Sequence, residues 1–138
     1  MTQILIVDDE EKLRHLLSMM LESKGMKTHK ATHGANALEM LAHNSYDLII
    51  SDIKMPVMDG KQLISKMREK NILTPVIFIT AFATIESAVE MMKQGACDYI
   101  TKPFESAKIH LAVEKAINLS RLITENQEMK QALSGAEK

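Results

Sequence analysis

Short runs of aliphatic residues alternate along this chain with longer segments in which apolar residues recur every three or four positions. The short runs predict five strands, and the longer segments predict a helix after each of them. The expected strands cover residues 4–7, 27–31, 48–50, 76–79 and 98–101. Nearly continuous apolar strands are typical of a parallel sheet, because right-handed crossovers place helices on both of its faces. The alternation therefore predicts an open, doubly wound α/β domain.

Each expected helix carries one apolar stripe that we expect to be buried against the sheet. In the first helix the stripe is formed by Leu13, Leu16, Leu17, Met20 and Leu21. In the fourth helix it is formed by Ile85, Ala88, Val89 and Met92. The strand at 27–31 is mostly polar, as an edge strand is, and it is the weakest strand signal in the sequence.

Composition excludes several other classes of protein. A chain of 138 residues with 46% apolar and 25% charged residues fits one globular domain. Its formal net charge of -1 disfavours direct contact with nucleic acid by this domain. Apolar runs of four or five residues are too short for a membrane span, and the start of the chain has no signal-peptide pattern. With Cys97 as its one cysteine, we expect a cytoplasmic protein without disulfides.

Polar and charged residues follow the expected strands at their carboxyl ends, where doubly wound sheets bind ligands. They are Asp8 and Asp9 after the first strand, Asp52 after the third, Thr80 after the fourth and Lys102 after the fifth. Three carboxylates brought together repel one another unless a cation neutralises them. Oxygen ligands with no His or Cys nearby favour Mg²⁺ or Mn²⁺ over zinc, and Mg²⁺ also binds phosphate oxygens.

The same residues predict a site for a phosphoryl group. Lys102 supplies a compact positive charge and Thr80 a hydroxyl donor for the phosphoryl oxygens. A carboxylate is an established nucleophile for forming an aspartyl phosphate. Asp52 is the better candidate for this nucleophile because it stands alone at a strand end, whereas the adjacent Asp8 and Asp9 have the form of a metal-binding pair.

Six short motifs occur in an order and spacing that resemble the receiver domain of two-component response regulators. They are Ile-Val-Asp-Asp-Glu at 6–10, Asp-Ile-Lys-Met-Pro at 52–56, Met-Asp-Gly at 58–60, Thr-Ala at 80–81, Gly-Ala-Cys-Asp-Tyr at 95–99 and Lys-Pro-Phe at 102–104. The resemblance covers about residues 3 to 120. It implies a flavodoxin-like fold with five parallel strands in the order 2-1-3-4-5 and five helices.

The resemblance also implies roles for the residues of the site. Asp52 would accept a phosphoryl group from a sensor histidine kinase, and Asp9, Asp52 and the backbone carbonyl of Lys54 would coordinate Mg²⁺. Asp8 would act through a bound water. Lys102 would hold the phosphoryl oxygens, and its peptide bond to Pro103 would be cis. Such a domain catalyses its own phosphorylation and dephosphorylation and is otherwise not an enzyme.

A conformational switch follows from the same resemblance. Thr80 would move toward the phosphoryl group, and Tyr99 would rotate inward behind it. The population shift would change the surface formed by the fourth helix, the fifth strand and the fifth helix. This surface would control an output domain or partner protein absent from this sequence, in transcription regulation.

The receiver pattern ends near residue 120, but the helical pattern continues through 121–138. Its seam has the alternating three and four spacing of a short coiled coil, with Asn126 at an a-type position, and comprises Leu119, Leu122, Asn126, Met129 and Leu133. We expect a homodimer through the fourth and fifth helices and this tail. An amphipathic extension that only caps the domain stays open as the alternative. The segment at 122–126 is loosely similar to the linker of enhancer-binding transcription activators.

Two other functions are alternatives to the receiver, and each needs a residue or motif that this sequence does not have at the expected position. A Mg²⁺-dependent phosphohydrolase with an aspartyl-phosphate intermediate, of the haloacid dehalogenase kind, uses a second carboxylate two residues after the nucleophile, and here that residue is Lys54. A nucleotide or flavin carrier needs a Gly-rich phosphate loop, and the sequence has no G-x-G-x-x-G motif.

Overall fold

The computed structural model describes residues 2–55, 57–81 and 84–136. For Ile85 and for residues 126–136 it describes the backbone but not the side chains. The strands and helices alternate along the whole chain. They are β1 (Gln3–Val7), α1 (Glu11–Glu22), β2 (Lys27–Ala31), α2 (Gly34–His43), β3 (Leu48–Asp52), α3 (Gly60–Glu69), β4 (Val76–Thr80), α4 (Ile85–Lys93), β5 (Asp98–Thr101) and α5 (Ser106–Ala136). The expected alternation of strand and helix is thus confirmed.

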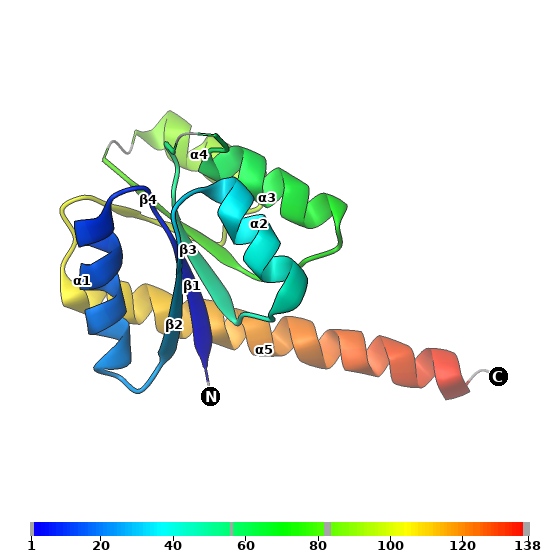
Figure 1. The fold of residues 1–138 in the computed structure, drawn as a ribbon. Coiled ribbons are helices and arrows are strands. Elements are labelled where there is room, and N and C mark those ends of the chain that lie inside the picture. The colour runs from blue at the N-terminus through cyan, green and yellow to red at the C-terminus, as the bar shows by residue number, and fades with distance from the viewer. Residues whose placement is uncertain (1, 56, 82–83, 137–138) are drawn as a thin grey trace.

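The five strands form one parallel sheet in the order β2-β1-β3-β4-β5. Figure 1 shows α1 and α5 on one face of this sheet and α2, α3 and α4 on the other. The fold is the expected flavodoxin-like, doubly wound architecture. The mostly polar strand β2 lies at one edge of the sheet, as predicted.

Side-chain alternation along the strands divides the apolar residues into two cores. In β1, Ile4 and Ile6 join the core beneath α1 and α5, whereas Leu5 and Val7 join the core beneath α2, α3 and α4. Successive side chains of a strand point to opposite faces, so a strand covered on both sides must be apolar at every position. Phe78 of β4 is the largest of the fully buried side chains.

The buried stripe predicted for α4 is wrong in two positions. Met91 is buried, whereas Val89 and Met92 are 48% and 47% exposed. Both Ala88 with Met91 and Val89 with Met92 are spaced three apart, so apolar periodicity offers two neighbouring stripes and does not tell which of them faces the sheet. In α1, Leu16 is likewise exposed, while Leu17 and Leu21 are buried. The unburied apolar side chains leave α1 and α4 with partly apolar outer faces.

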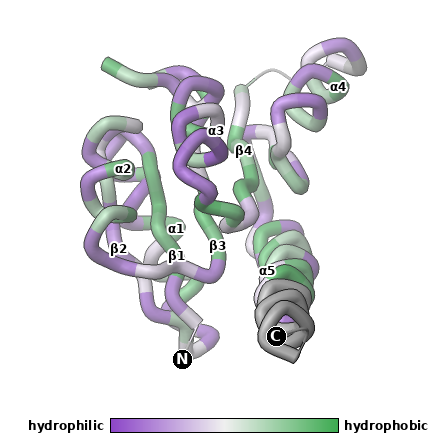
Figure 2. The backbone as a smooth tube through the Cα atoms, turned by 90° about the vertical axis from the view of Figure 1, so that its right-hand side faces the viewer, coloured by the Kyte–Doolittle hydropathy of each residue, from purple (hydrophilic) through white to green (hydrophobic). Residues whose placement is uncertain are grey.

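Helix α5 is a single helix of 31 residues that packs on the sheet with its first part and extends beyond the body with its last part (Figure 1). Ile109, Val113 and Ile117 lie in the core. Figure 2 looks nearly along this helix and shows it on the opposite side of the molecule from α2 and β2. The expected seam residues Asn126, Met129 and Leu133 lie among the side chains outside the description. None of the helices in the described ranges is both long and apolar enough to cross a bilayer.

Candidate functional site

Three carboxylates gather at the carboxyl edge of the sheet. Asp8 and Asp9 follow β1 directly, and Asp52 ends β3, which lies beside β1 in the sheet. Each of the three offers a carboxylate oxygen within 4.8 Å of the others. Parallel pairing of neighbouring strands brings their ends to one edge, as the sequence predicted. The three expected metal-site carboxylates are therefore one cluster.

Asp8 is the buried member of this cluster, with a side chain only 1% exposed. One of its oxygens, Oδ1, accepts a hydrogen bond of 2.8 Å from the backbone amide of Glu10. The other oxygen, Oδ2, is buried without a hydrogen-bond partner in the described part of the chain. Burial raises the pKa of Asp8 to about 6, and the negative charge of Asp52 adds to this effect. A buried carboxylate of this kind favours a proton or a cation.

Lys102 brings a positive charge to the cluster from the loop after β5. Its Nζ atom lies 3.1 Å from Oδ2 of Asp52, and both side chains are largely shielded from solvent. Burial lowers the pKa of Lys102, but the hydrogen bond and charge of Asp52 outweigh it and raise the pKa overall. The amide of Lys102 donates to the carbonyl of Thr80 at 2.8 Å. The peptide bond between Lys102 and Pro103 is cis, as the resemblance implied.

Thr80 lies on β4, the strand beside that of Asp52, and Tyr99 lies on β5, one strand further along the sheet. Thr80 ends β4 and is paired in register with Thr101 of β5. Tyr99 is partly buried and packs against the core beneath α2, α3 and α4. Lys54 is exposed in the loop after β3, two residues beyond Asp52. All the residues that the sequence proposed for the site and its switch thus lie at or near one end of the sheet.

The loop from β3 to α3 is fixed by a close backbone contact at Gly60. The amide of Gly60 donates to the carbonyl of Ile53 at 2.7 Å. A Cβ atom at Gly60 would lie 2.6 Å from the carbonyl oxygen of Asp52, closer than real Cβ contacts allow. Asp59 begins α3 with a capping box to Gln62. The Asp-Gly pair of the motif therefore shapes the backbone on which Asp52 stands.

The chemistry of the cluster fits a hard divalent cation. Its ligand atoms are carboxylate oxygens, which Mg²⁺ prefers, and no His or Cys belongs to the group. The unpartnered Oδ2 of Asp8 supplies a buried acceptor that a metal-bound water would satisfy. Negative charge exceeds positive charge among Asp8, Asp9, Asp52 and Lys102, so a cation lowers the repulsion between the carboxylates.

Comparison with known proteins agrees with this geometry. The family model of the response regulator receiver domain matches residues 4–114. The chain belongs to this family. Receiver domains serve signalling in two-component systems and typically bind Mg²⁺ at an acidic pocket, and this chain has an acidic cluster formed by Asp8, Asp9 and Asp52.

The relatives of this receiver domain are longer proteins. The chain is 42% identical over 132 residues to the regulatory protein AtoC of Escherichia coli, covering 96% of this chain and 29% of AtoC. It is 39% identical over 125 residues to the transcriptional regulatory protein SrrA of Staphylococcus aureus, covering 91% of this chain and 52% of SrrA. The chain therefore spans only part of the length of these relatives.

Solved structures share the receiver fold. The receiver domain of the Francisella response regulator 1452 superposes with a TM-score of 0.83 at 33% identity, over 87% of this chain and 99% of that domain. NtrX from Brucella abortus superposes with a TM-score of 0.85 at 31% identity, over 94% of this chain and 30% of NtrX. This receiver domain has the architecture of both.

The contact that Arg14 makes next to the site was not predicted from the sequence. Its guanidinium donates to the backbone carbonyl of Asp8 from the first turns of α1. An arginine five residues after an acidic pair carries no special signal in a sequence, because its reach depends on how the chain turns between β1 and α1. Cys97 packs against the core, and burial raises the pKa of its thiol to about 11.

Proposed function

We propose that this domain takes a phosphoryl group from a sensor histidine kinase onto Asp52, with Mg²⁺ in the acidic cluster. The observation that carries the proposal is the ion pair between Asp52 and Lys102 beside two further carboxylates, one of which has a buried oxygen without a partner. In the reaction an oxygen of Asp52 attacks phosphorus, the bond from phosphorus to the kinase histidine breaks, and the histidine leaves.

The proposed ligands of Mg²⁺ are Asp9, Asp52 and the backbone carbonyl of Lys54, with Asp8 acting through a water. When bound, the metal neutralises the carboxylates and binds phosphoryl oxygens. Lys102 holds a further phosphoryl oxygen, because its ammonium already lies at hydrogen-bond distance from Asp52. The hydroxyl of Thr80 is the expected donor to a third.

The switch that we propose links the site to the surface formed by α4, β5 and α5. Thr80 moves toward the phosphoryl group, and Tyr99 rotates inward into the space behind it. The support is topological, since Thr80 ends β4 and Tyr99 lies on β5, its neighbour in the sheet. The bound phosphoryl group favours the conformation in which both Thr80 and Lys102 contact it.

Intact-protein mass spectrometry after incubation with acetyl phosphate tests the assignment. We expect a gain of one phosphoryl group that requires Mg²⁺ and disappears in Asp52→Asn. Asp59→Asn is the matched control, because asparagine caps a helix as well as aspartate does and the residue stands seven positions away. Full labelling of Asp52→Asn would contradict the proposal.

A regulatory role in transcription is the output we propose, through a further domain or a partner protein in the cytoplasm. Relatives with the names regulatory protein AtoC and transcriptional regulatory protein SrrA support this output. Direct contact between this domain and nucleic acid is not part of the proposal, because its formal net charge is -1.

We also propose a homodimer through α4, α5 and the tail at 121–138, with residues 1–120 as the receiver domain. The outer face of α4 exposes Val89 and Met92 beside Glu86 and Glu90. The outer face of α5 exposes Leu111, 54% accessible, between the cations of Lys108 and Lys115. A two-fold axis sets the acidic face of each copy against the basic face of the other.

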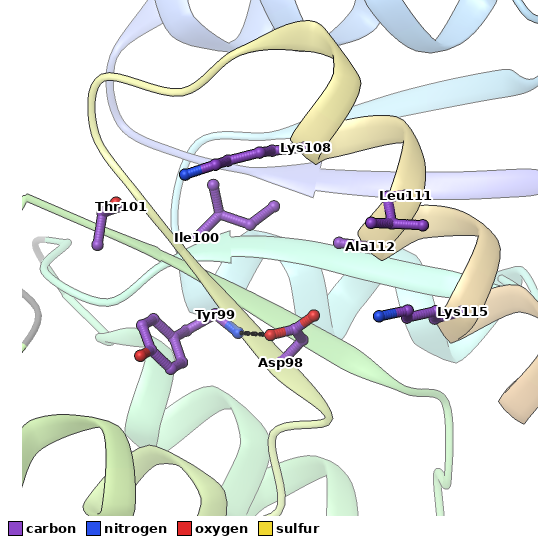
Figure 3. A pocket seen from close by; sticks show the side chains of 8 residues that line it. All are labelled: Asp98, Tyr99, Ile100, Thr101, Lys108, Leu111, Ala112 and Lys115. Atoms are coloured by element: carbon purple, nitrogen blue, oxygen red, sulfur yellow. Dashed lines mark hydrogen bonds between the residues drawn. The ribbon is translucent and has the colours of Figure 1, made fainter. Parts of the chain in front are cut away.

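A cavity between β5 and α5 supports this arrangement. Figure 3 shows Lys108 and Lys115 of α5 on either side of Leu111, with Lys115 beside Asp98 of β5. The cavity is open and about 390 Å³ in volume. Its lining carries two cations, Lys108 and Lys115, against one carboxylate, Asp98, so a glutamate of α4 from a second copy fits its net positive charge. Along the same helix, Leu119 and Leu122 are exposed and continue the apolar stripe into the tail.

Light scattering after size-exclusion chromatography tests the dimer, with and without acetyl phosphate. We expect Glu90→Lys and Lys115→Glu each to weaken the dimer and the double variant to restore it. Glu39→Lys on α2 is the matched control for the charge reversal, since it lies away from α4 and α5. A monomer at all concentrations in both phosphorylation states would contradict the proposed dimer.

A further inference from the structure

The two peptide groups on either side of Asp9 are held by side chains. Backbone pairing between β1 and β2 ends at Asp8, whose amide donates to Ala31 at 3.1 Å. The carbonyl of Asp8 then accepts from the guanidinium of Arg14. On the other side, the amide of Glu10 donates to Oδ1 of Asp8. The orientation of both peptide planes beside Asp9 is therefore fixed.

Asp9 itself has little else to hold it. Its side chain is exposed, and within the described ranges its carboxylate makes neither a hydrogen bond nor an ion pair. One of its oxygens nevertheless lies within 4.8 Å of oxygens of Asp8 and Asp52. Since no side chain steers this carboxylate toward the cluster, the backbone on either side of Asp9 must aim it.

We propose that Arg14 is a positioning residue for the metal site, acting through the peptide plane between Asp8 and Asp9. The inference rests on the proposed function, in which Asp9 is a ligand of Mg²⁺. Without the guanidinium, the carbonyl of Asp8 turns toward water to find a donor. The backbone at Asp9 then samples orientations in which its carboxylate points away from Asp8 and Asp52. Mg²⁺ binding must first select the orientation in which the three carboxylates are together, and this selection weakens the affinity.

The charge of Arg14 acts in the opposite direction. A guanidinium beside the cluster repels a divalent cation, so removing only its charge strengthens Mg²⁺ binding. Losing its hydrogen bond weakens Mg²⁺ binding. Whether Mg²⁺ affinity falls or rises when Arg14 is replaced therefore distinguishes a positioning role from a purely electrostatic one. Lys12, exposed in the same first turn of α1, supplies the matched charge change without a contact to Asp8.

Titration with MgCl₂, followed by ¹⁵N-¹H correlation spectra at 25 °C, tests the proposal on the whole chain. We expect Arg14→Met to raise the Mg²⁺ dissociation constant about 10-fold, the effect usual for losing a partner that orients a metal ligand. Lys12→Met should change it by less than about twofold and toward tighter binding. Urea unfolding in EDTA shows that each variant is folded at the temperature of the titration.

A double-variant cycle shows whether Arg14 acts through Asp9. In the background of Asp9→Asn, Arg14→Met should have little further effect on Mg²⁺ affinity. Equal or tighter binding by Arg14→Met, or a full additional loss in Asp9→Asn, overturns the positioning role while leaving the metal site intact. Failure of the wild type to bind Mg²⁺ overturns the metal site of the proposed function, and the role of Arg14 with it.

Discussion

The ammonium of Lys102 lies 3.1 Å from Oδ2 of Asp52, although fifty positions separate the two residues in the chain. The pair joins the end of β3 to the loop after β5, across the end of β4. The ammonium of Lys102 is therefore placed to stabilise negative charge on an oxygen of a phosphoryl group bound to Asp52.

Replacement of Lys102 by methionine should slow the labelling of Asp52 by acetyl phosphate about 100-fold, because a preorganised charge donor is lost. The rate of mass gain in the presence of Mg²⁺ measures this effect. Lys24→Met, in the turn after α1, serves as the control and should label at the wild-type rate. An unchanged rate in Lys102→Met would remove Lys102 from the site.

Asp8 should make stability depend on pH in the absence of metal. Its pKa is about 6 in the folded protein against an ordinary value of 3.8. Between these values the folded protein holds a proton that the unfolded chain has released. The free energy of unfolding therefore falls as pH rises from about 4 to about 6. Urea unfolding in EDTA across this range measures the slope.

Replacement of Asp8 by asparagine should remove this slope and raise the free energy of unfolding at pH 7 by about 1–3 kcal/mol. Mg²⁺ should stabilise the wild type and have a much smaller effect on the variant. Asp59→Asn makes the same chemical change at a helix cap and should shift stability by less than about 0.5 kcal/mol. A slope that persists in Asp8→Asn would assign it to another group.

Replacement of Gly60 by alanine should disturb both stability and the site. The new Cβ would meet the carbonyl oxygen of Asp52 at 2.6 Å and the ring of Phe78 at 3.0 Å. We expect a loss of about 1–3 kcal/mol and slower labelling, since the backbone at Asp52 must move. Gly25→Ala is the matched control, because its φ of 82° costs about 1 kcal/mol while space is open. It should destabilise without slowing the labelling.

Val57 should be a site where stability is easily gained. Its φ is 69°, a left-handed conformation that a β-branched residue rarely adopts, and its side chain is 79% exposed. Asparagine tolerates this conformation, as Asn71 does at a φ of 59°. We expect Val57→Asn to raise the free energy of unfolding by up to about 1 kcal/mol in a urea titration. A loss of stability would contradict this account.

The sheet was predictable from sequence because three of its strands, β1, β3 and β4, are mostly apolar. A strand that is apolar on both sides is stable only when both faces of the sheet are covered, so these runs predict a buried parallel sheet. Helix faces were less predictable, as α4 demonstrates: Met91 rather than Val89 and Met92 lies in the core. The direction in which α4 leaves β4 decides between two equally spaced stripes, and that direction is a property of tertiary packing.

The site residues were predictable because topology brings the ends of parallel strands together. Asp8, Asp9 and Asp52 needed only the strand assignment to be placed in one cluster. The burial of Asp8 and the contact of Arg14 with its carbonyl were not predictable, because both depend on the path of the loop between β1 and α1.

Because α5 is long, a small tilt where it packs on the sheet moves its far end by a much larger distance. From Ile117, which packs in the core, to Ala136 the helix measures roughly 28 Å at about 1.5 Å per residue. A tilt of only about 5° at the root displaces the tip by about 2.5 Å. A rotation too small to break the packing of the body is thus large enough, at the far end, to exchange one set of side-chain neighbours for another.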